Sequence, residues 1–224
     1  MAKRRTKKPA KTVAKKAKRG QKVARRVKRR ALAHGGKRGK RRGAKRVKRG
    51  VRQIAIPAKL SSQVASYLKK TKGRYEAIGH RTVFTAFDAS QTLKVDIASV
   101  AKSLVLQDGG DTIVAVVPAS RNLDIKALRK VVSSHRARHG KPAARKLSFA
   151  SERSIKSRLK ATPGAVSPFG PMLGIETFVD RLLTKPRTIV VSGGNFETSL
   201  KMTPNEMLRL SEGIVGSFSV ARPK

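Results

Sequence analysis

A single lysine inside an apolar stretch is the first candidate for chemistry in this sequence. Lys102 stands in the run Val100-Ala101-Lys102-Ser103-Leu104-Val105, where every other residue suits a buried strand. A compact ammonium group in such surroundings can bind a phosphate and stabilise the oxyanion that forms when an ester is hydrolysed. The simpler alternative is an edge-strand lysine whose aliphatic part is covered while its charge extends to solvent.

A loop rich in proline and glycine is the second candidate. It runs Thr162-Pro163-Gly164-Ala165-Val166-Ser167-Pro168-Phe169-Gly170. Proline fixes φ and glycine permits backbone angles that a side chain forbids, so the sequence predicts a stiff loop with exposed peptide groups. Such a loop can hold a ligand by its backbone. Taken alone, it is equally compatible with an ordinary surface connection.

The residue inventory excludes several other chemistries. The chain has no cysteine, no Gly-x-Ser-x-Gly motif and no obvious Ser/His/Asp set, so we expect no side-chain nucleophile. His135 and His139 have the spacing of a helical metal site. Arg136 and Arg138 lie between them and no carboxylate is near, so we expect neither a metal nor a cofactor.

The charge is concentrated at the N-terminus. The 224 residues include 54 Lys and Arg against 12 Asp and Glu, a net charge of +42. Residues 1–52, called the basic arm below, contain 26 of these cations and no acid. The arm resembles the Lys/Ala-rich tails of histone H1-like bacterial proteins. We expect it to be disordered and to bind nucleic acid through phosphates, with RNA and DNA both open as partners.

The apolar segments are too short for a membrane protein. The longest run, Ile113–Val117, is far below the roughly 20 residues that a membrane-spanning helix needs, and no apolar signal region follows Met1. We therefore expect a soluble, cytoplasmic protein without membrane contact, with association with the nucleoid as an alternative. An organelle transit peptide is the less favoured interpretation, because the arm is long, rich in lysine and poor in serine.

Residues 53–224 have the composition of one folded domain with mixed secondary structure. Hydrophobic spacing and capping residues predict helices over Pro57–Leu68, Asp88–Leu93, Ile125–Ser133 and Ser151–Leu159, and one beginning at Pro204. Strands are predicted over Tyr75–Ile78, Val83–Ala86, Ala101–Gln107, Thr112–Val117, Lys146–Ala150, Thr177–Leu182 and Thr188–Ser192. The turn Asp108-Gly109-Gly110-Asp111 predicts a hairpin. The expected class is α+β with a mixed sheet.

Several motifs together resemble a known family. They are His80, Thr85-Ala86, Val100 to Val105, Gly164 to Gly170, Asp180 and Val191-Ser192-Gly193-Gly194, in this order. The pattern is similar to the YbaK/EbsC family, which is related to the editing insertion domain of bacterial prolyl-tRNA synthetases, and it covers about residues 54–221. The resemblance implies a barrel-like mixed sheet surrounded by helices. It also implies a deacylase that acts in trans on the aminoacylated acceptor end of tRNA, with Cys or Ala on tRNA for proline as substrates.

The same resemblance assigns roles to individual residues. Lys102 and Gly164 would be catalytic, Gly164 positioning the aminoacyl group by its backbone while water attacks the ester. The residues implied in substrate binding are His80, Pro168, Phe169, Asp180, Ser192, Gly193 and Gly194. For five of these residues a structural role stays open: a polar turn at His80, a strand end at Asp180 and a turn at Ser192–Gly194.

The segment from Ser133 to Lys146 is longer and more basic than the family pattern. Its cations are candidates for a second contact with the acceptor stem: Arg136, Arg138, Lys141, Arg145 and Lys146. A solvated basic loop is the alternative. For the whole chain, the alternative to an enzyme is a nucleoid-type protein that binds DNA or RNA and whose folded domain is catalytically idle.

Overall fold

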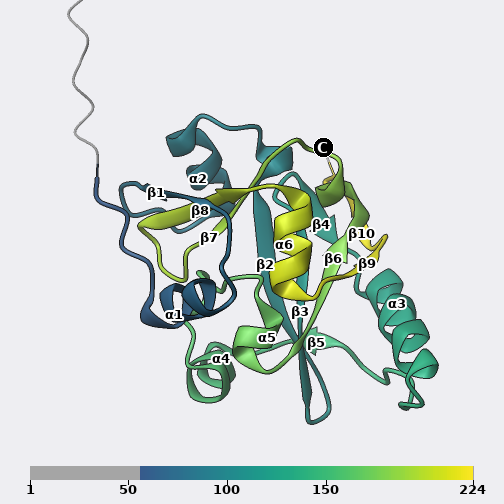
Figure 1. Cartoon of the computed structure of the whole chain (residues 1–224). Coiled ribbons are helices and arrows are strands. Elements are labelled where there is room, and N and C mark those ends of the chain that lie inside the picture. The colour runs from purple at the N-terminus through teal and green to yellow at the C-terminus, as the bar shows by residue number, and fades with distance from the viewer. Residues whose placement is uncertain (1–55, 224) are drawn as a thin grey trace, which may run out of the picture. The chain divides into compact units, whose positions relative to one another are not determined.

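A five-stranded mixed sheet forms the centre of the computed structural model, which describes residues 56–223 (Figure 1). The prediction of a disordered basic arm over residues 1–52 lies outside these residues. In the sheet, β2 (Ala101–Asp108) and β3 (Asp111–Pro118) form the predicted antiparallel hairpin around Gly109 and Gly110. Strand β6 (Glu176–Asp180) runs parallel to β3, and β9 (Ile214–Gly216) runs parallel to β6. The short β5 (Ser148–Phe149) pairs with β2 and completes the order β5-β2-β3-β6-β9.

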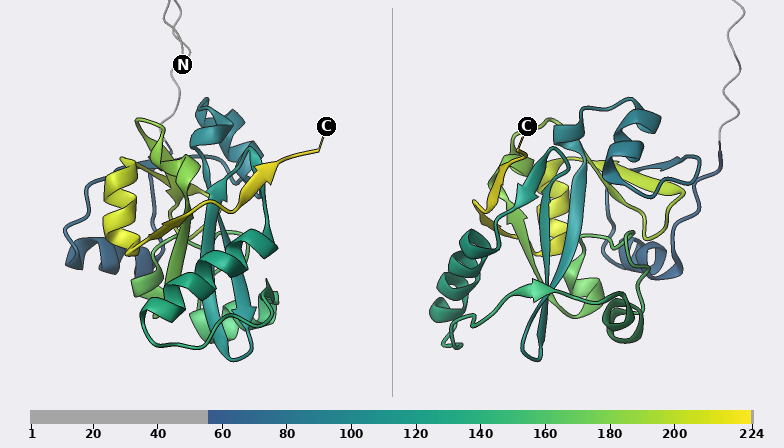
Figure 2. Two further views of the ribbon diagram at one scale, coloured as in Figure 1. Left: turned by 90° about the vertical axis from the view of Figure 1, so that its right-hand side faces the viewer. Right: turned by 180° about the vertical axis from the view of Figure 1, so that it is seen from behind.

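Both faces of this sheet are covered, which explains the uninterrupted apolar run of β3. Ile113, Ala115 and Val117 pack on one face with Leu128 and Val132 of α3 (Ile125–Arg138). The alternate residues, Val114 and Val116, pack on the other face with residues of the remaining helices and of the second sheet. Figure 2 shows α3 and α6 on opposite sides of the sheet. Lys102 therefore lies on a strand next to the most buried element of the fold.

The remaining strands among residues 56–223 form two smaller sheets. The first has the order β1-β8-β7, with β1 (Glu76–Gly79), β8 (Thr198–Met202) and β7 (Ile189–Ser192) antiparallel. A bridge between Val100 and Val190 connects it to the start of β2. The second pairs β10 (Ser219–Ala221) with β4 (Arg121–Leu123). The sheets form no closed barrel in the described part of the chain, whereas the predicted α+β class is confirmed.

All described helices except α5 (Gly170–Leu173) begin where the sequence offers a hydroxyl or carboxylate cap. Besides α3 and α5, the described helices are α1 (Ser62–Lys70), α2 (Ala86–Leu93), α4 (Glu152–Leu159), α6 (Pro204–Ser211) and the 3₁₀ turns η1 (Ile97–Ser99) and η2 (Arg181–Thr184). The predicted caps Asp124 and Thr203 accept the N–H groups of Ala127 and Glu206. No helix among residues 56–223 has both the length and the apolar character that crossing a membrane requires.

Three predicted elements differ from the structure for identifiable reasons. The first helix begins at Ser62, because Ser61 and not Pro57 supplies the cap for its first turn. The predicted strand Val83–Ala86 is absent, because Thr85 accepts the N–H of Asp88 and starts α2. Helix α3 continues past Ser133 to Arg138, where Arg136 reaches carboxylates of the β2–β3 hairpin.

Candidate active site

A cavity of about 540 Å³ collects residues from segments that are far apart in the sequence. Its walls come from Val83–Phe87 and Ala89, from the first half of β2, from the loop at Gly164, from β7 and β8, and from Arg222. Four of the predicted site residues line it: His80, Lys102, Gly164 and Ser192. No carboxylate side chain is among the described residues that line the cavity, so its walls are electropositive.

Lys102 enters this cavity from β2, where it pairs with Val117 of β3. Its side chain is half-buried and forms no ion pair with a carboxylate of residues 56–223. Burial lowers the pKa of Lys102 from the ordinary lysine value, and the positive charge of Arg222 lowers it further. An ammonium group held this way lacks a counterion and suits an anionic ligand.

The loop at Gly164 forms a second wall, and its backbone needs glycine. Gly164 has a φ of +82°, and a Cβ at this position would come within 3.3 Å of the Phe196 ring. The N–H of Ala165 donates to the carbonyl of Thr162 at 3.0 Å and closes the turn. No hydrogen bond within the described part of the chain uses the N–H of Gly164. Because Gly164 is exposed and lines the cavity, its N–H is a candidate donor to a ligand there.

Two serines fasten the loop to the end of β7. The hydroxyl of Ser192 donates to the carbonyl of Ala165 at 2.8 Å, and the hydroxyl of Ser167 donates to the carbonyl of Ser192 at 2.9 Å. The N–H of Gly194 donates to the Ser192 oxygen at 3.1 Å. Ser192 thus lines the cavity and also holds the loop in place.

His80 is buried with both ring nitrogens engaged. Its Nδ1 lies 2.8 Å from the carbonyl oxygen of Arg81, and its Nε2 lies 2.9 Å from the hydroxyl of Ser199. Because a carbonyl can only accept, Nδ1 carries a proton and Nε2 faces the Ser199 hydroxyl. Ser199 also lines the cavity. His80 therefore holds the hydroxyl of Ser199 in place in the cavity wall.

The mouth of the cavity contains features that the sequence reasoning missed. Phe84 and Phe87 are 69% and 54% exposed although both are large and apolar, and Phe84 lies 5.2 Å from Phe196 between ring centroids. Arg222 adds a second cation to the lining. The two phenylalanines could have been noticed in the sequence, because they flank Thr85-Ala86 in a chain with few aromatic residues.

Two predicted substrate-binding residues belong to the buried part of the loop and do not line the cavity. Phe169 is fully buried in the core and stacks on Tyr67 with 5.8 Å between ring centroids. The carbonyl of Pro168 accepts a hydrogen bond from the Thr177 hydroxyl at 3.1 Å. Both residues anchor the loop that contains Gly164 to the core.

Gly193 and Gly194 occupy the turn between β7 and β8. The N–H of Gly193 donates to the carbonyl of Thr198 at 2.9 Å, and a Cβ at Gly194 would lie 2.2 Å from the Ser61 hydroxyl oxygen. Neither glycine lines the cavity that contains Lys102. These contacts agree with the alternative that the sequence left open, in which the two glycines form a turn.

Asp180 lies at the end of β6, away from the cavity lining. Its buried carboxylate accepts the N–H of Leu182 at 3.0 Å and the N–H of Phe218 at 2.9 Å. It therefore starts η2 and holds the segment that leads into β10. Of the two roles considered for Asp180, this arrangement is the strand-terminating one.

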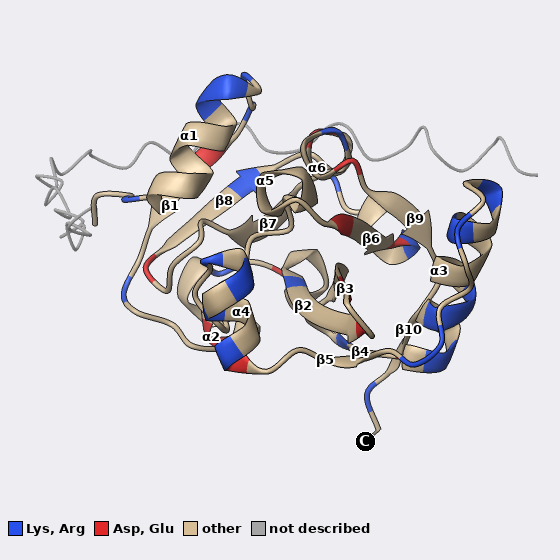
Figure 3. Ribbon diagram, turned by 90° about the horizontal axis from the view of Figure 1, so that it is seen from below, with Lys and Arg blue, Asp and Glu red and all other residues tan. Residues whose placement is uncertain are grey.

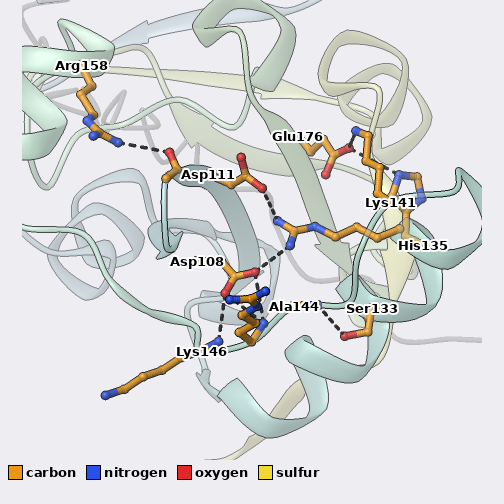
Figure 4. Close-up of polar contacts among 12 residues, drawn as sticks. Asp108, Asp111, Ser133, His135, Lys141, Ala144, Lys146, Arg158 and Glu176 are labelled. Atoms are coloured by element: carbon orange, nitrogen blue, oxygen red, sulfur yellow. Dashed lines mark hydrogen bonds and ion pairs between the residues drawn. The ribbon is translucent and has the colours of Figure 1, made fainter.

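Arg136 is the predicted nucleic-acid contact that the structure places in the interior. Its Nη1 lies 2.6 Å from Asp108 Oδ2 and its Nη2 lies 3.1 Å from Asp111 Oδ2, and its side chain is only 6% exposed. Asp108 also accepts the N–H groups of Arg145 and Lys146 (Figure 4). Arg136 thus serves the fold, because its charge is already neutralised and covered.

The same contacts set the ionisation of Asp108. Burial alone would raise the pKa of its carboxyl, but the hydrogen bonds from Lys146, Arg136 and Arg145 outweigh burial and hold the pKa below the ordinary aspartate value. Asp108 consequently stays charged and fixes the chain that follows α3.

The other predicted contacts, Arg138, Lys141, Arg145 and Lys146, are exposed. Together with three exposed cations of α3 they form what we call the basic surface: Lys126, Arg129, Lys130, Arg138, Lys141, Arg145 and Lys146. Figure 3 shows cations along α3 and the segment after it. Within the basic surface, Lys141 contacts Glu176 at 3.0 Å, the one ion pair found there among residues 56–223.

The histidine pair on α3 lies near this surface. His135 and His139 have ring centroids 4.4 Å apart, and His135 Nε2 lies 3.7 Å from Glu176 Oε1. Burial lowers the pKa of His135 despite the opposing effect of Glu176. No group of three or more metal-ligating side chains occurs among the residues that the structure describes.

Comparison with known proteins places this site in a family. The model of the aminoacyl-tRNA editing domain matches residues 80–210, more than half of the 224-residue chain, and this range includes Lys102 and Gly164. The prolyl-tRNA editing protein ProX of Acetoanaerobium sticklandii is 35% identical over 112 residues, which are 48% of this chain and 60% of ProX. The match thus spans about 60% of that curated relative's length.

Solved structures share the fold. A candidate trans-editing enzyme for prolyl tRNA synthetase superposes with a TM-score of 0.59 at 20% identity, over 73% of this chain and 100% of that chain. The hypothetical protein APE2540 gives a TM-score of 0.60 at 21% identity, over 70% of this chain and 99% of its own. These likenesses show the fold, and the family match extends over both walls of the cavity. The chain belongs to the aminoacyl-tRNA editing domain family, as its sequence motifs predicted.

Proposed function

We propose that this protein is a trans-editing hydrolase that removes the amino acid from mischarged tRNA. One observation carries the proposal: Lys102 and Gly164, which are far apart in the sequence, line the same cavity, and no described carboxylate lines it with them. The substrate is a polyanion with an ester at its end, and the charge of the cavity and of the whole chain favours such a molecule.

The reaction needs few groups from the protein. Water attacks the carbonyl carbon of the aminoacyl ester, and an oxyanion forms on the carbonyl oxygen. The bond to the ribose oxygen then breaks, the ribose oxygen takes up a proton, and free amino acid and tRNA result. The N–H of Gly164 positions the aminoacyl group and the ammonium of Lys102 stabilises the oxyanion. The neighbouring ribose hydroxyl orients the water.

The proposed substrates are Cys or Ala attached to tRNA for proline. The name of the relative ProX supports tRNA for proline. A cavity of about 540 Å³ has room for a small aminoacyl group together with the terminal nucleoside. Since a pocket discriminates one small group, such as a methyl or a thiol, by only about 1–3 kcal/mol, we expect discrimination between Cys and Ala to be modest.

The rest of the tRNA has two proposed contacts. One is the basic arm, with 26 cations in residues 1–52. The other is the basic surface on α3 and the segment after it, where six of the seven cations have no ion pair with a carboxylate of residues 56–223. Both would bind phosphates without reading the bases.

The test is deacylation of a panel of mischarged tRNAs, with Cys and Ala on tRNA for proline first. We expect wild type to release amino acid and Lys102→Ala to be slower by a factor of roughly 100 or more, as for loss of an oxyanion donor. Lys69→Ala is the matched control, because Lys69 is exposed on α1 and does not line the cavity. Equal turnover by wild type and Lys102→Ala, or no turnover on any tRNA, would contradict the proposal.

A further inference from the structure

Arg222 is brought to the active-site cavity by a pairing at the far end of the chain. Strand β10 pairs with β4, and the side chain of Arg121 donates to the hydroxyl of Ser219 at 3.0 Å, which holds β10 in place. Directly after β10, the guanidinium of Arg222 donates to the carbonyl of Ala119. Arg222 lines the cavity together with Lys102. No part of the proposed reaction uses it so far.

The surroundings of Arg222 leave most of its donors free. A guanidinium has five N–H donors, and one contact with Ala119 fixes its orientation while the others remain available. No ion pair joins Arg222 to a carboxylate of residues 56–223. The carboxylate of Asp88 on the neighbouring helix α2 is held by the Thr85 hydroxyl at 2.7 Å. A fixed fork of donors without a counterion is a binding site for a phosphate or a carboxylate.

The two cations of the cavity differ in depth. Lys102 is half-buried on β2, whereas Arg222 is exposed. An ester carbonyl can enter a desolvated wall, but a phosphodiester is charged and continues into the rest of the nucleic acid, so it belongs at the open side. The exposed rings of Phe84 and Phe87 line the same cavity and offer a face on which a base can stack. Cation and rings together fit a nucleoside monophosphate unit.

We propose that Arg222 binds the phosphate on the 5′ side of the terminal nucleoside of the substrate, which leaves Lys102 for the reacting carbonyl. This inference rests on the proposed function for the identity of its ligand. It assigns Arg222 to substrate binding and predicts an effect on KM and little effect on kcat, whereas removal of Lys102 lowers kcat.

The test compares adenosine 5′-monophosphate with adenosine, which lacks the phosphate, by NMR titration of the full chain. Wild type should bind the monophosphate about 10- to 100-fold more tightly, as charge-assisted hydrogen bonds of this kind allow. In Arg222→Gln the two ligands should bind alike, and Arg222→Lys should retain part of the preference. Arg187→Gln is the matched control, because Arg187 is exposed and outside the cavity lining.

Deacylation kinetics give the second readout. With an active substrate, Arg222→Gln should raise KM by a similar factor and leave kcat within about twofold, with an unchanged thermal midpoint. The inference would be overturned if wild type bound the monophosphate and adenosine alike. It would also be overturned if Arg222→Gln kept the wild-type preference for the monophosphate. If wild type hydrolyses no tRNA, the proposed function fails, while the comparison of the two small ligands still decides the role of Arg222.

Discussion

At the scale of single residues, the half-buried ammonium of Lys102 should reduce the stability of the fold. Because burial lowers its pKa, the folded chain binds this proton less tightly than the unfolded chain does. The penalty is full below the folded-state pKa and disappears as the pH rises toward the ordinary lysine value of about 10.4. Lys102→Met should therefore raise the thermal midpoint at pH 7 by the order of 2 °C and abolish turnover.

Scanning calorimetry at several pH values measures this effect. The gain of Lys102→Met over wild type should shrink as the pH rises through the lowered pKa of Lys102 toward the ordinary lysine value. Lys69→Met, on the exposed face of α1, should show no such pH-dependent gain. A lower midpoint for Lys102→Met would mean that the ammonium group stabilises the fold, contrary to its desolvation.

Gly164 should be sensitive to the smallest side chain. Gly164→Ala forces a Cβ onto a residue with a φ of +82° and brings it within 3.3 Å of the Phe196 ring. We expect a loss of about 1–2 kcal/mol in unfolding free energy from the backbone, and at least a tenfold loss of kcat from displacement of the loop.

Gly174→Ala separates these two effects. Gly174 has a φ of +69°, but a Cβ there would meet nothing within 4 Å, and the residue is outside the cavity lining. It should lose similar stability in urea denaturation and keep its kcat. Equal kcat losses in the two variants would show that backbone strain, and not the position of the loop, limits turnover.

At the scale of elements, the contact between α3 and the β2–β3 hairpin depends on one buried ion pair. The side chains of Asp108 and Arg136 are each 6% exposed, whereas Asp111 is 71% exposed. Asp108→Asn should lower the unfolding free energy by about 3 kcal/mol at pH 7, because it leaves a buried arginine undercompensated. Asp111→Asn should cost less than about 1 kcal/mol.

The pH dependence of this contact has a defined sign. Since the pKa of Asp108 is held below the ordinary aspartate value, its contribution is present above about pH 4 and is lost as the pH falls through the folded-state pKa. Urea denaturation between pH 3 and pH 7 should show this loss in wild type and a flatter profile in Asp108→Asn. Parallel profiles would contradict the assignment.

Some elements of the fold could be predicted from the sequence, and others could not. The β2–β3 hairpin was predictable, because its apolar runs and its Asp-Gly-Gly-Asp turn are local signals. The last turn of α3 was not, because Arg136 is stabilised by Asp108, 28 residues away. The short β4 and β10 likewise depend on each other across 98 residues, as the contact between Arg121 and Ser219 illustrates.

The candidate site could likewise be predicted from the sequence only in part. Lys102 and Gly164 stood out by an odd charge and by loop chemistry, and the family resemblance joined them. Pro168 and Phe169 share the same loop, but the loop is buried from Ala165 to Gly170 and Phe169 packs in the core, which one sequence cannot reveal. Arg222 carries no local signal, since only the pairing of β10 brings it to the cavity.

At the scale of the whole molecule, charge divides the chain into two parts. Deleting residues 1–52 removes 26 positive charges and lowers the net charge from +42 to +16. We expect tRNA binding to weaken and its dependence on salt to become less steep, because fewer counterions are released. Turnover at saturating tRNA should persist, since every proposed catalytic residue lies beyond the arm.

Filter binding at several salt concentrations tests this division, with the full chain as reference and duplex DNA as competitor. An arm that binds tRNA and DNA alike, in a chain without deacylation, would support the alternative of a nucleoid-type protein. An unchanged salt slope after deletion would instead place the phosphate contacts on the folded domain, where Lys126, Arg129 and Lys130 are the next residues to replace.

Because β1 pairs with β8, their sheet cannot form during synthesis until β8 has been made. Glu76 pairs with Lys201, so 125 residues separate the two strands. At a synthesis rate of about 5–20 residues per second, β8 follows β1 by roughly 6–25 s. During this interval the wall that contains Ser192 and Ser199 is missing, and the nascent chain has already exposed its 26 arm cations to the RNA around it. The cations of the basic arm are therefore synthesised before the strands of the proposed editing cavity are complete.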